Sequence, residues 1–516
     1  PLLTILVWCD VSTARGQWLG VGGNRARTSV AARGPRDLSR VRWSATPDPN
    51  EQYVYQSTPA VADARVFVNA RVIRGAMHVA NRLIAYDAVD GARLWSANVA
   101  PDILDSWSSP AIDIRNGAVL LASDDHLYSF DQVTGDLLWK YDLTRPVVNA
   151  SPVVTADLTV AGAPANRALI TEYDAIGAAA AMLAINVDPF DAAGNPYNPG
   201  DLVWTLPLGR ASGATPAYAD DHAYVAVGAG EFVRVEVSSP PPDPNNPGCV
   251  LADWRTPVTV NGAGDGAGFF GGVSVCDGAV FGATYNFVGG RNSAQLFKID
   301  ANTGAETWQT ACERTDSIPV PVGSQRWLAG GIEGFGSDWT MQRFTDSGGA
   351  GVLQWDSAAS GFDPPIGGWA EQPAYARGLL YVGSPVSTDP NAPPPGGMTF
   401  EPYQQLLIVD TAVDPNQPGF VVDRFIGAGG SPALAHGRLF SIGADGLFAF
   451  DPSPPCAADI DASGLVDLTD LSLLLAHFDA QRGTSGYDAN YDLNLDGMID
   501  LFDLSLLLTH FDQACN

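Results

Sequence analysis

The chain has 516 residues, with 57 acidic side chains against 28 basic ones and a formal net charge of −29. This charge argues against binding to nucleic acid or to anionic membranes, because their phosphates would be repelled. The 55 Gly and 38 Pro, with only 16% charged residues, favour short strands joined by tight turns. No apolar run reaches the roughly 20 residues that a membrane-spanning helix needs.

Residues 1–36 are expected to form an N-terminal extension. They begin with the apolar segment Pro1 to Trp8, which is too short to span a bilayer. Its β-prone residues predict a strand that pairs either within this molecule or with a neighbouring one.

A strand–turn–strand repeat runs through residues 37–451. Each clear copy has an Asp before the turn, a Gly within it and a Trp on the second strand. We expect the Asp to accept hydrogen bonds from the turn, the Gly to adopt a positive φ and the Trp to pack against the next sheet. The three clearest copies begin at Ala85, Ser129 and Lys298 and end at Trp95, Trp139 and Trp308.

The copies recur about every 40 to 65 residues, a length that suits a four-stranded propeller blade. Seven complete copies are expected to start near residues 57, 107, 149, 212, 268, 317 and 370. An eighth begins near residue 430 and stops after Asp451, without an outer strand. The segment Leu38 to Ala45 has the form of that missing strand, so we predict an all-β, eight-bladed propeller closed by an N-terminal strand.

The repeat resembles the pyrroloquinoline-quinone-like (PQQ-like) family, whose consensus is close to Ala-x-Asp-x-x-Thr-Gly-x-x-x-Trp. The segment Gln17 to Thr28 is similar to the lead-in of such proteins. The family includes quinone-dependent dehydrogenases and non-catalytic assembly scaffolds. The dehydrogenases typically carry a disulfide between adjacent cysteines, and no two of the six cysteines here are adjacent. Nor does any matching motif place a catalytic Asp beside a calcium-binding Glu and Asn. Both departures weigh against a redox enzyme.

After a linker at 452–458, residues 459–516 contain two twelve-residue loops with the ligand spacing of an EF-hand. Calcium prefers hard oxygen ligands, and Gly at the sixth position permits the sharp turn. The seventh position contributes a backbone carbonyl, so an apolar side chain is tolerated there. We therefore predict two Ca²⁺ sites. The expected ligands are Asp459, Asp461, Ser463, Leu465, Asp467 and Asp470 in the first, and Asp492, Asn494, Asp496, Met498, Asp500 and Asp503 in the second.

Each loop is followed by nearly the same amphipathic helix, Leu471 to Phe478 and Leu504 to Phe511. His477 and His510 occupy equivalent positions on these helices, where we interpret them as residues of the polar edge, not as a metal pair. Cys456 and Cys515 bracket the module, which suggests a disulfide clasp and an oxidising compartment. The pairing of Cys9, Cys249, Cys276 and Cys312 stays open between bridges and free thiols.

Residues 456–515 resemble type I dockerin repeats, small all-α calcium-binding domains. The resemblance implies a cohesin-like partner, recognised at loop positions 10 and 11. These positions hold Leu468 and Thr469 in one copy and Leu501 and Phe502 in the other, which is more apolar than a Ser/Thr pair. A different protein partner, or a contact with the propeller itself, is therefore the alternative.

These features predict a secreted or cell-surface binding or assembly protein. Its propeller would be a scaffold and residues 456–516 a calcium-dependent interaction module, with self-assembly into homo-oligomers or polymers as one mode. The rival hypothesis is an extracellular enzyme tethered by its dockerin, either a quinone-dependent dehydrogenase or a polysaccharide-active propeller. The sequence assigns no catalytic residue and no cofactor-binding residue within the propeller.

Overall fold

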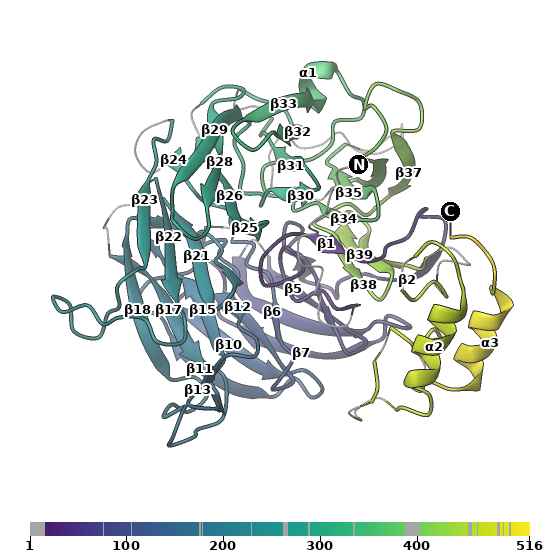
Figure 1. Cartoon of the computed structure of the whole chain (residues 1–516), viewed down its shortest axis with the longest axis horizontal. Helices are drawn as coiled ribbons and strands as arrows, with labels where there is room; N and C mark the ends of the chain where they lie inside the picture. The colour runs from purple at the N-terminus through teal and green to yellow at the C-terminus, as the bar shows by residue number, and fades with distance from the viewer. Residues whose placement is uncertain are drawn as a thin grey trace, which may run out of the picture.

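The structure is a computed structural model. It describes residues 16–75, 77–104, 106–174, 177, 179–228, 230–261, 267–286, 289–333, 336–386, 403–452, 457–461, 463–481, 484, 486–488, 490–494 and 497–515. Strands in this described part form eight antiparallel sheets of four or five strands, arranged around a central axis as the blades of a propeller (Figure 1). The predicted all-β, eight-bladed fold is confirmed.

Each blade is built mainly from strands that are close in sequence. The first four blades are β4 (Ala60–Ala62), β3 (Glu51–Tyr53), β5 (Arg65–Arg74), β6 (Met77–Asp87) and β7 (Arg93–Val99); β8 (Ala111–Asp113), β9 (Ala118–Ser123), β10 (His126–Asp131) and β11 (Leu137–Asp142); β12 (Val153–Val154), β15 (Arg167–Thr171), β17 (Ala180–Asn186) and β18 (Leu202–Gly209); and β20 (Ala217–Ala219), β21 (His222–Val227), β22 (Glu231–Glu236) and β23 (Trp254–Pro257).

The last four blades follow in chain order. They are β25 (Val273–Cys276), β26 (Ala279–Ala283), β28 (Ala294–Asp300) and β29 (Glu306–Cys312); β30 (Val320–Val322), β31 (Gln325–Gly330), β32 (Thr340–Asp346) and β33 (Gly351–Asp356); β1 (Val30–Ala31), β34 (Ala374–Ala376), β35 (Leu379–Ser384), β36 (Gln405–Asp410) and β37 (Val421–Ile426); and β38 (Ala433–Ala435), β39 (Arg438–Gly443), β40 (Gly446–Phe450) and β2 (Val41–Ala45).

Short two-stranded sheets and helices lie outside the eight blades. Among the residues that the structure describes, three two-stranded sheets pair β13 (Thr159–Val160) with β14 (Ala163–Pro164), β16 (Tyr173–Asp174) with β19 (Ala211–Ser212), and β24 (Ala267–Gly268) with β27 (Tyr285–Asn286). The helices are α1 (Ser357–Ser360), α2 (Leu468–Ala476) and α3 (Leu501–Thr509), and the last two lie together beside the propeller (Figure 1). Among the described residues, no helix has the length and apolar character that crossing a bilayer requires.

The repeat motif joins each blade to the next. The Trp95 indole N–H donates to the carbonyl of Gln132 at 3.0 Å, and its ring lies where a Cβ on Gly135 would be, only 2.5 Å from the nearest ring atom. Gly135 has a φ of 75°, and Asp131 accepts hydrogen bonds from the turn backbone, including one at 2.8 Å from Thr134. The motif therefore needs Gly both for the turn and for the neighbouring indole.

A second set of contacts consists of hydrogen bonds between neighbouring blades around the propeller axis. The polar residue before the Pro of one blade, a Ser, Thr or Gln, accepts a hydrogen bond from the corresponding backbone N–H of the preceding blade. This arrangement satisfies buried N–H groups that have no partner in their own sheet. The links are Thr58 N to Ser109 Oγ at 2.9 Å, Ser109 N to Ser151 Oγ at 2.9 Å, Ser151 N to Thr215 Oγ1 at 3.0 Å, Ile318 N to Gln372 Oε1 at 2.7 Å and Gln372 N to Ser431 Oγ at 3.0 Å.

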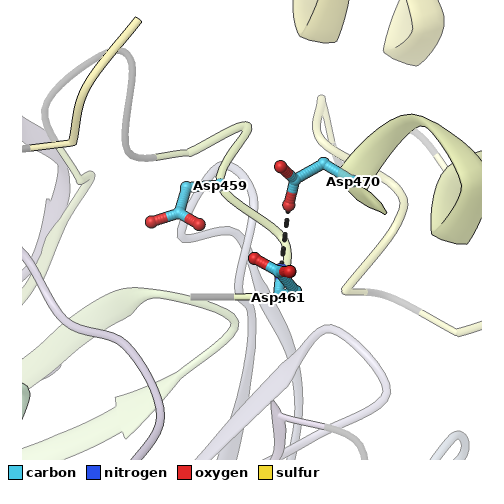
Figure 2. Close-up of side chains that lie close together, drawn as sticks. All are labelled: Asp459, Asp461 and Asp470. Carbon is cyan, nitrogen blue, oxygen red and sulfur yellow. Dashed lines mark hydrogen bonds between the residues drawn. The ribbon is translucent and has the colours of Figure 1, made fainter. Parts of the chain in front are cut away.

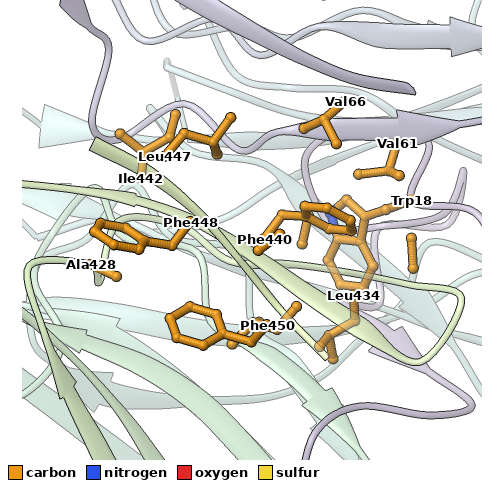
Figure 3. Packing of buried hydrophobic residues seen from close by; sticks show 14 of the residues in the cluster. Trp18, Val61, Val66, Ala428, Leu434, Phe440, Ile442, Leu447, Phe448 and Phe450 are labelled. Atoms are coloured by element: carbon orange, nitrogen blue, oxygen red, sulfur yellow. The ribbon is translucent and has the colours of Figure 1, made fainter. Parts of the chain in front are cut away.

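The two ends of the repeat region meet in the eighth blade. Strand β2 pairs antiparallel with β40, with Val41 opposite Phe450, as predicted for the closing strand. Trp18 and Val61 pack in the same buried cluster as Phe440 and Leu434, as Figure 3 shows. The strand β2 therefore supplies the outer strand of the eighth blade and covers the edge that β40 would otherwise expose.

Candidate calcium loops, their seat on the propeller and the axial cavity

The first predicted calcium loop brings three carboxylates together. One oxygen from each of Asp459, Asp461 and Asp470 lies within 4.8 Å of the others, and Figure 2 shows Asp470 bonded to the backbone of Asp461. Asp470 Oδ1 accepts the N–H groups of Ile460 at 2.6 Å and Asp461 at 2.9 Å, and its Oδ2 accepts that of Asp467 at 2.8 Å. The last residue of the loop thus holds the start of the loop in place.

Asp459, the first residue of this loop, is fully buried. Its Oδ2 accepts the N–H of Gly464 at 3.0 Å, whereas its Oδ1 has no hydrogen-bond partner among the described residues. A buried carboxylate oxygen without a partner is costly, and a cation between the three carboxylates would supply the missing interaction. The residues therefore fit a hard divalent ion such as Ca²⁺.

The second loop repeats these contacts in the same register. Asp503 Oδ1 accepts the N–H of Leu493 at 2.7 Å and of Asn494 at 3.2 Å, and Gly497 N–H donates to Asp492 Oδ2 at 2.9 Å. Asp503 Oδ2 accepts the N–H of Asp500 at 2.8 Å. Asp496 lies outside the described residues. The remaining loop therefore has the same backbone frame as the first.

Local sequence explains why both loops adopt this form. Gly464 and Gly497 have φ values of 96° and 95°, a region that other residues avoid. Asp467 and Asp500 cap α2 and α3, and each pairs with the Asp three residues later in a capping box. The ninth and twelfth loop positions thus also start the helix.

The carboxyl groups at position 12 of both loops have raised pKa values. Burial raises the pKa of Asp470, and the nearby Asp461 carboxylate raises it further. Burial likewise raises the pKa of Asp503, with a smaller contribution from Asp492. Both shifts arise because these carboxylates are removed from water and lie near a second carboxylate.

The remaining predicted donors are less buried. Ser463 Oγ donates to the carbonyl of Leu465 at 3.1 Å, and Leu465 and Met498 both expose their apolar side chains. The two histidines make ordinary local contacts: His477 stacks on Tyr491 at 4.1 Å, and His510 lies 3.3 Å from Gln513 Oε1.

The cysteines are only partly described. Cys249 and Cys312 are free thiols. Cys276 and Cys515 are each disulfide-bonded, while Cys9 and Cys456 lie outside the described residues. The predicted clasp between Cys456 and Cys515 therefore stays a prediction.

The module exposes apolar side chains at the start of each helix. Leu468, Leu501 and Phe502 are 71%, 70% and 69% exposed, and Leu475 and Leu508 are exposed at equivalent positions further along. Loop positions 10 and 11 in both copies therefore present a surface to solvent, with Thr469 also exposed.

The module rests on the propeller through arginines that the sequence did not single out. Arg377 donates to Asp459 Oδ2 at 2.8 Å, and Arg33 donates to the Asp459 carbonyl at 3.2 Å. A cavity of about 290 Å³ lies along this seam, with Arg40, Arg42 and Arg438 among its lining residues. Such contacts depend on how two distant parts of the chain sit together, so repeat patterns give no signal for them.

Side chains of the described residues pack into the centre of the propeller. Residues after Trp18 cross the inner strands, where Arg27 is fully buried and donates to the carbonyl of Pro152 at 2.8 Å. Trp107 and Trp369 pack edge to face at 5.2 Å. The axial cavity, lined by Asn149, Asp316 and their neighbours, has a volume of about 20 Å³, which is enough for one water molecule. The Gly-rich and aromatic segments at 268–272 and 369–373 contribute to this packing.

Comparisons with known proteins concern the propeller. The PQQ_2 family model, described as outer membrane protein assembly factor BamB, matches residues 38–171. A search of curated proteins finds no match.

Three solved structures share the fold. BamB from Moraxella catarrhalis has a TM-score of 0.51 and 14% identity, covering 81% of this chain and 98% of its own. A europium-containing methanol dehydrogenase has a TM-score of 0.51 and 12% identity, covering 83% and 90%. A quinohemoprotein alcohol dehydrogenase from Comamonas testosteroni has a TM-score of 0.52 and 12% identity, covering 97% and 93%. The chain is thus an eight-bladed propeller of the PQQ-like fold, and its residues 38–171 match the PQQ_2 repeat family.

Proposed function

We propose that this chain is an extracellular or cell-surface assembly protein, with the propeller as scaffold and residues 456–516 as a calcium-dependent docking module of the dockerin type. The observation that carries the proposal is the hydrogen-bond frame that the two loops share, in which the aspartates at positions 1 and 12 are buried. Two Ca²⁺ ions would be held by the oxygen donors of Asp459 to Asp470 and of Asp492 to Asp503.

The docking surface follows from the same repeat. Calcium would fix each loop against its helix, and the helix starts carry the exposed side chains of Leu468, Leu501 and Phe502. A solvent-exposed apolar cluster on a small acidic module favours a protein partner that buries it. The partner is a cohesin-like domain or a second copy of this chain, and a disulfide between Cys456 and Cys515 would hold the module's ends in an oxidising compartment.

The enzyme hypothesis has less support. The solved dehydrogenases share only the fold at 12% identity. The axial cavity formed by the described residues, at about 20 Å³, is far smaller than the roughly 300 Å³ or more of typical ligand pockets.

Calcium binding is tested by thermal unfolding of the full chain. Saturating Ca²⁺ should stabilise the module by about 2.7 kcal/mol for each occupied site at a free concentration 100 times Kd, and chelation should remove the gain. The variant D459A/D492A should lose this response. The control D479N/D512N removes the same charge from two exposed positions outside the loops and should keep it. An equal response in both double variants would contradict the proposal.

Docking is tested with calcium as the only variable. Immobilised full chain should capture purified cohesin-like domains or a tagged second copy when Ca²⁺ is present and release them into EDTA. The variant L501S/F502S should bind calcium normally yet lose capture. Calcium-independent capture, or none by either probe, would count against a docking role.

A further inference from the structure

The first calcium loop is held by the propeller as well as by its own residues. Arg377 lies in the turn between β34 and β35, where its φ of 48° is left-handed. From there its guanidinium donates to Oδ2 of the fully buried Asp459, and the Arg377 side chain is itself 30% exposed. Arg33, which follows β1, binds the carbonyl of Asp459 at 3.2 Å and that of Ala457 at 3.5 Å. The propeller therefore contacts Asp459, the expected ligand at loop position 1, through both its side chain and its backbone.

The two loops differ in where this outer contact comes from. In the second loop, Oδ2 of Asp492 accepts a hydrogen bond from the hydroxyl of Tyr487 at 2.6 Å, within the module. The residue at the equivalent place in the first copy is Pro454, which has no side-chain donor. At the first loop the propeller supplies, through Arg377, the kind of hydrogen bond that Tyr487 supplies from within the module at the second, where Asp492 also interacts electrostatically with Arg438 of the propeller.

The contact leaves one oxygen of the carboxylate without a hydrogen bond from the described residues. Oδ2 of Asp459 has two donors, Gly464 N–H and Arg377, whereas Oδ1 is buried without a partner among the described residues. Arg377 and a cation would therefore bind different oxygens and would not compete. Outer hydrogen bonds of this kind orient a metal ligand, and their loss typically costs 10- to 100-fold in affinity, to order of magnitude.

Opposite charges on the module and on the propeller support the contact between them. Residues 457–516 carry eleven aspartates and a single arginine, Arg482. The cavities along the seam are lined by arginines on the propeller side, namely Arg33, Arg36, Arg40, Arg42, Arg377 and Arg438. Oppositely charged surfaces fix the orientation in which two bodies dock.

We infer that Arg377 is a positioning residue of the first calcium site, and that calcium binding at this site is coupled to the seating of the module on the propeller. The inference rests on the proposed function, that the loops bind calcium. Calcium would order the loop that Arg33 and Arg377 hold, and the arginines would in turn orient Asp459 for calcium. Such coupling is reciprocal, because each event must favour the other by the same factor.

Calorimetric titration of Ca²⁺ into the EDTA-stripped full chain tests whether Arg377 positions the first calcium site. R377Q should weaken one of the two sites about tenfold and leave the other unchanged. Y487F should weaken the other site instead, and the double variant should weaken both. R377K, which keeps the charge and a donor, should restore part of the affinity, whereas R255Q on a distant blade should change neither site.

Limited proteolysis at 452–458 and small-angle X-ray scattering test whether calcium binding is coupled to the seating of the module on the propeller. Calcium should protect this linker and lower the radius of gyration of the wild-type chain, and R377Q with both sites saturated should stay more open. Two normal sites that are insensitive to R377Q, or a tighter site in R377Q, would overturn the inference while leaving calcium binding intact. If the wild-type chain binds no calcium, the proposed function fails as well.

Discussion

At the scale of single residues, burial decides which charges the fold can carry. Glu371 is fully buried, and its Oε1 accepts a hydrogen bond from the N–H of Gly383, while Oε2 has no partner among the described residues. Burial raises the pKa of Glu371 well above its usual value. The carboxyl group is therefore neutral in the folded protein at a pH where it ionises in the unfolded chain.

This difference predicts a pH-dependent effect of E371Q. Because the folded pKa is raised, the stabilising contribution of Glu371 is complete below about pH 4 and declines as the pH rises towards the folded pKa. E371Q keeps the acceptor without an ionisable group. Its advantage over wild type should be small near pH 4 and grow by up to about 1.4 kcal/mol per pH unit above that. Urea unfolding of both proteins in saturating calcium measures the difference, and a constant difference would contradict it.

At the scale of elements, the hydroxyl links between blades explain a sequence signal. Small polar residues precede Pro in most copies of the repeat, and the structure uses Ser109, Ser151 and Thr215 as acceptors for the preceding blade. Removing such an acceptor leaves a buried N–H unpaired.

S151A should therefore destabilise the propeller by about 1–3 kcal/mol, because the N–H of Ser109 loses its acceptor. Ser129 is the matched control. It is also buried, but its hydroxyl has no hydrogen-bond partner among the described residues, so S129A should be neutral or slightly stabilising. Chemical unfolding of both variants makes the comparison, and equal losses would show that the hydroxyl link has no special role.

Most of the blades could be predicted from the repeat, because Asp, Gly and Trp each have a local reason to recur. The three two-stranded sheets and the parallel strand β1 could not, since they arise in insertions and in the extension where no copy guides the prediction. The hydrogen-bond frame that the two loops share could be predicted for the same reason as the blades, whereas calcium binding by these loops stays a prediction. Arg377 was not, because it lies 82 residues from Asp459 and meets it only through the packing of the module on the ring.

At the scale of the whole molecule, stability depends on closing the ring. Trp43 on β2 donates to the carbonyl of Ala88 at 3.0 Å, just as Trp95 donates to Gln132 at an interior junction. Truncating a large buried aromatic residue typically costs about 3–5 kcal/mol. The two junctions differ in how they are built. Among the described residues, the junction at Trp43 is the only one held by a strand from the other end of the repeat region.

W43A should therefore expose sheet edges at this junction and associate as its concentration rises, whereas W95A should be destabilised yet remain monomeric. Light scattering coupled to size-exclusion chromatography distinguishes these outcomes. Equal behaviour of the two variants would show that the closing junction is no weaker than the others.

The pairing of Val41 with Phe450 also has a consequence for synthesis. A nascent chain emerging from the ribosome makes β2 early, yet the partner of that strand appears about four hundred residues later. Blades whose strands are close in sequence can fold as they emerge, but β2 stays unpaired until β40 has been made. Bringing such distant segments together is slow. Residues 459–515 are made after every strand of the eight blades, so the proposed calcium loops would form only on a molecule whose ring already has all the strands it needs to close.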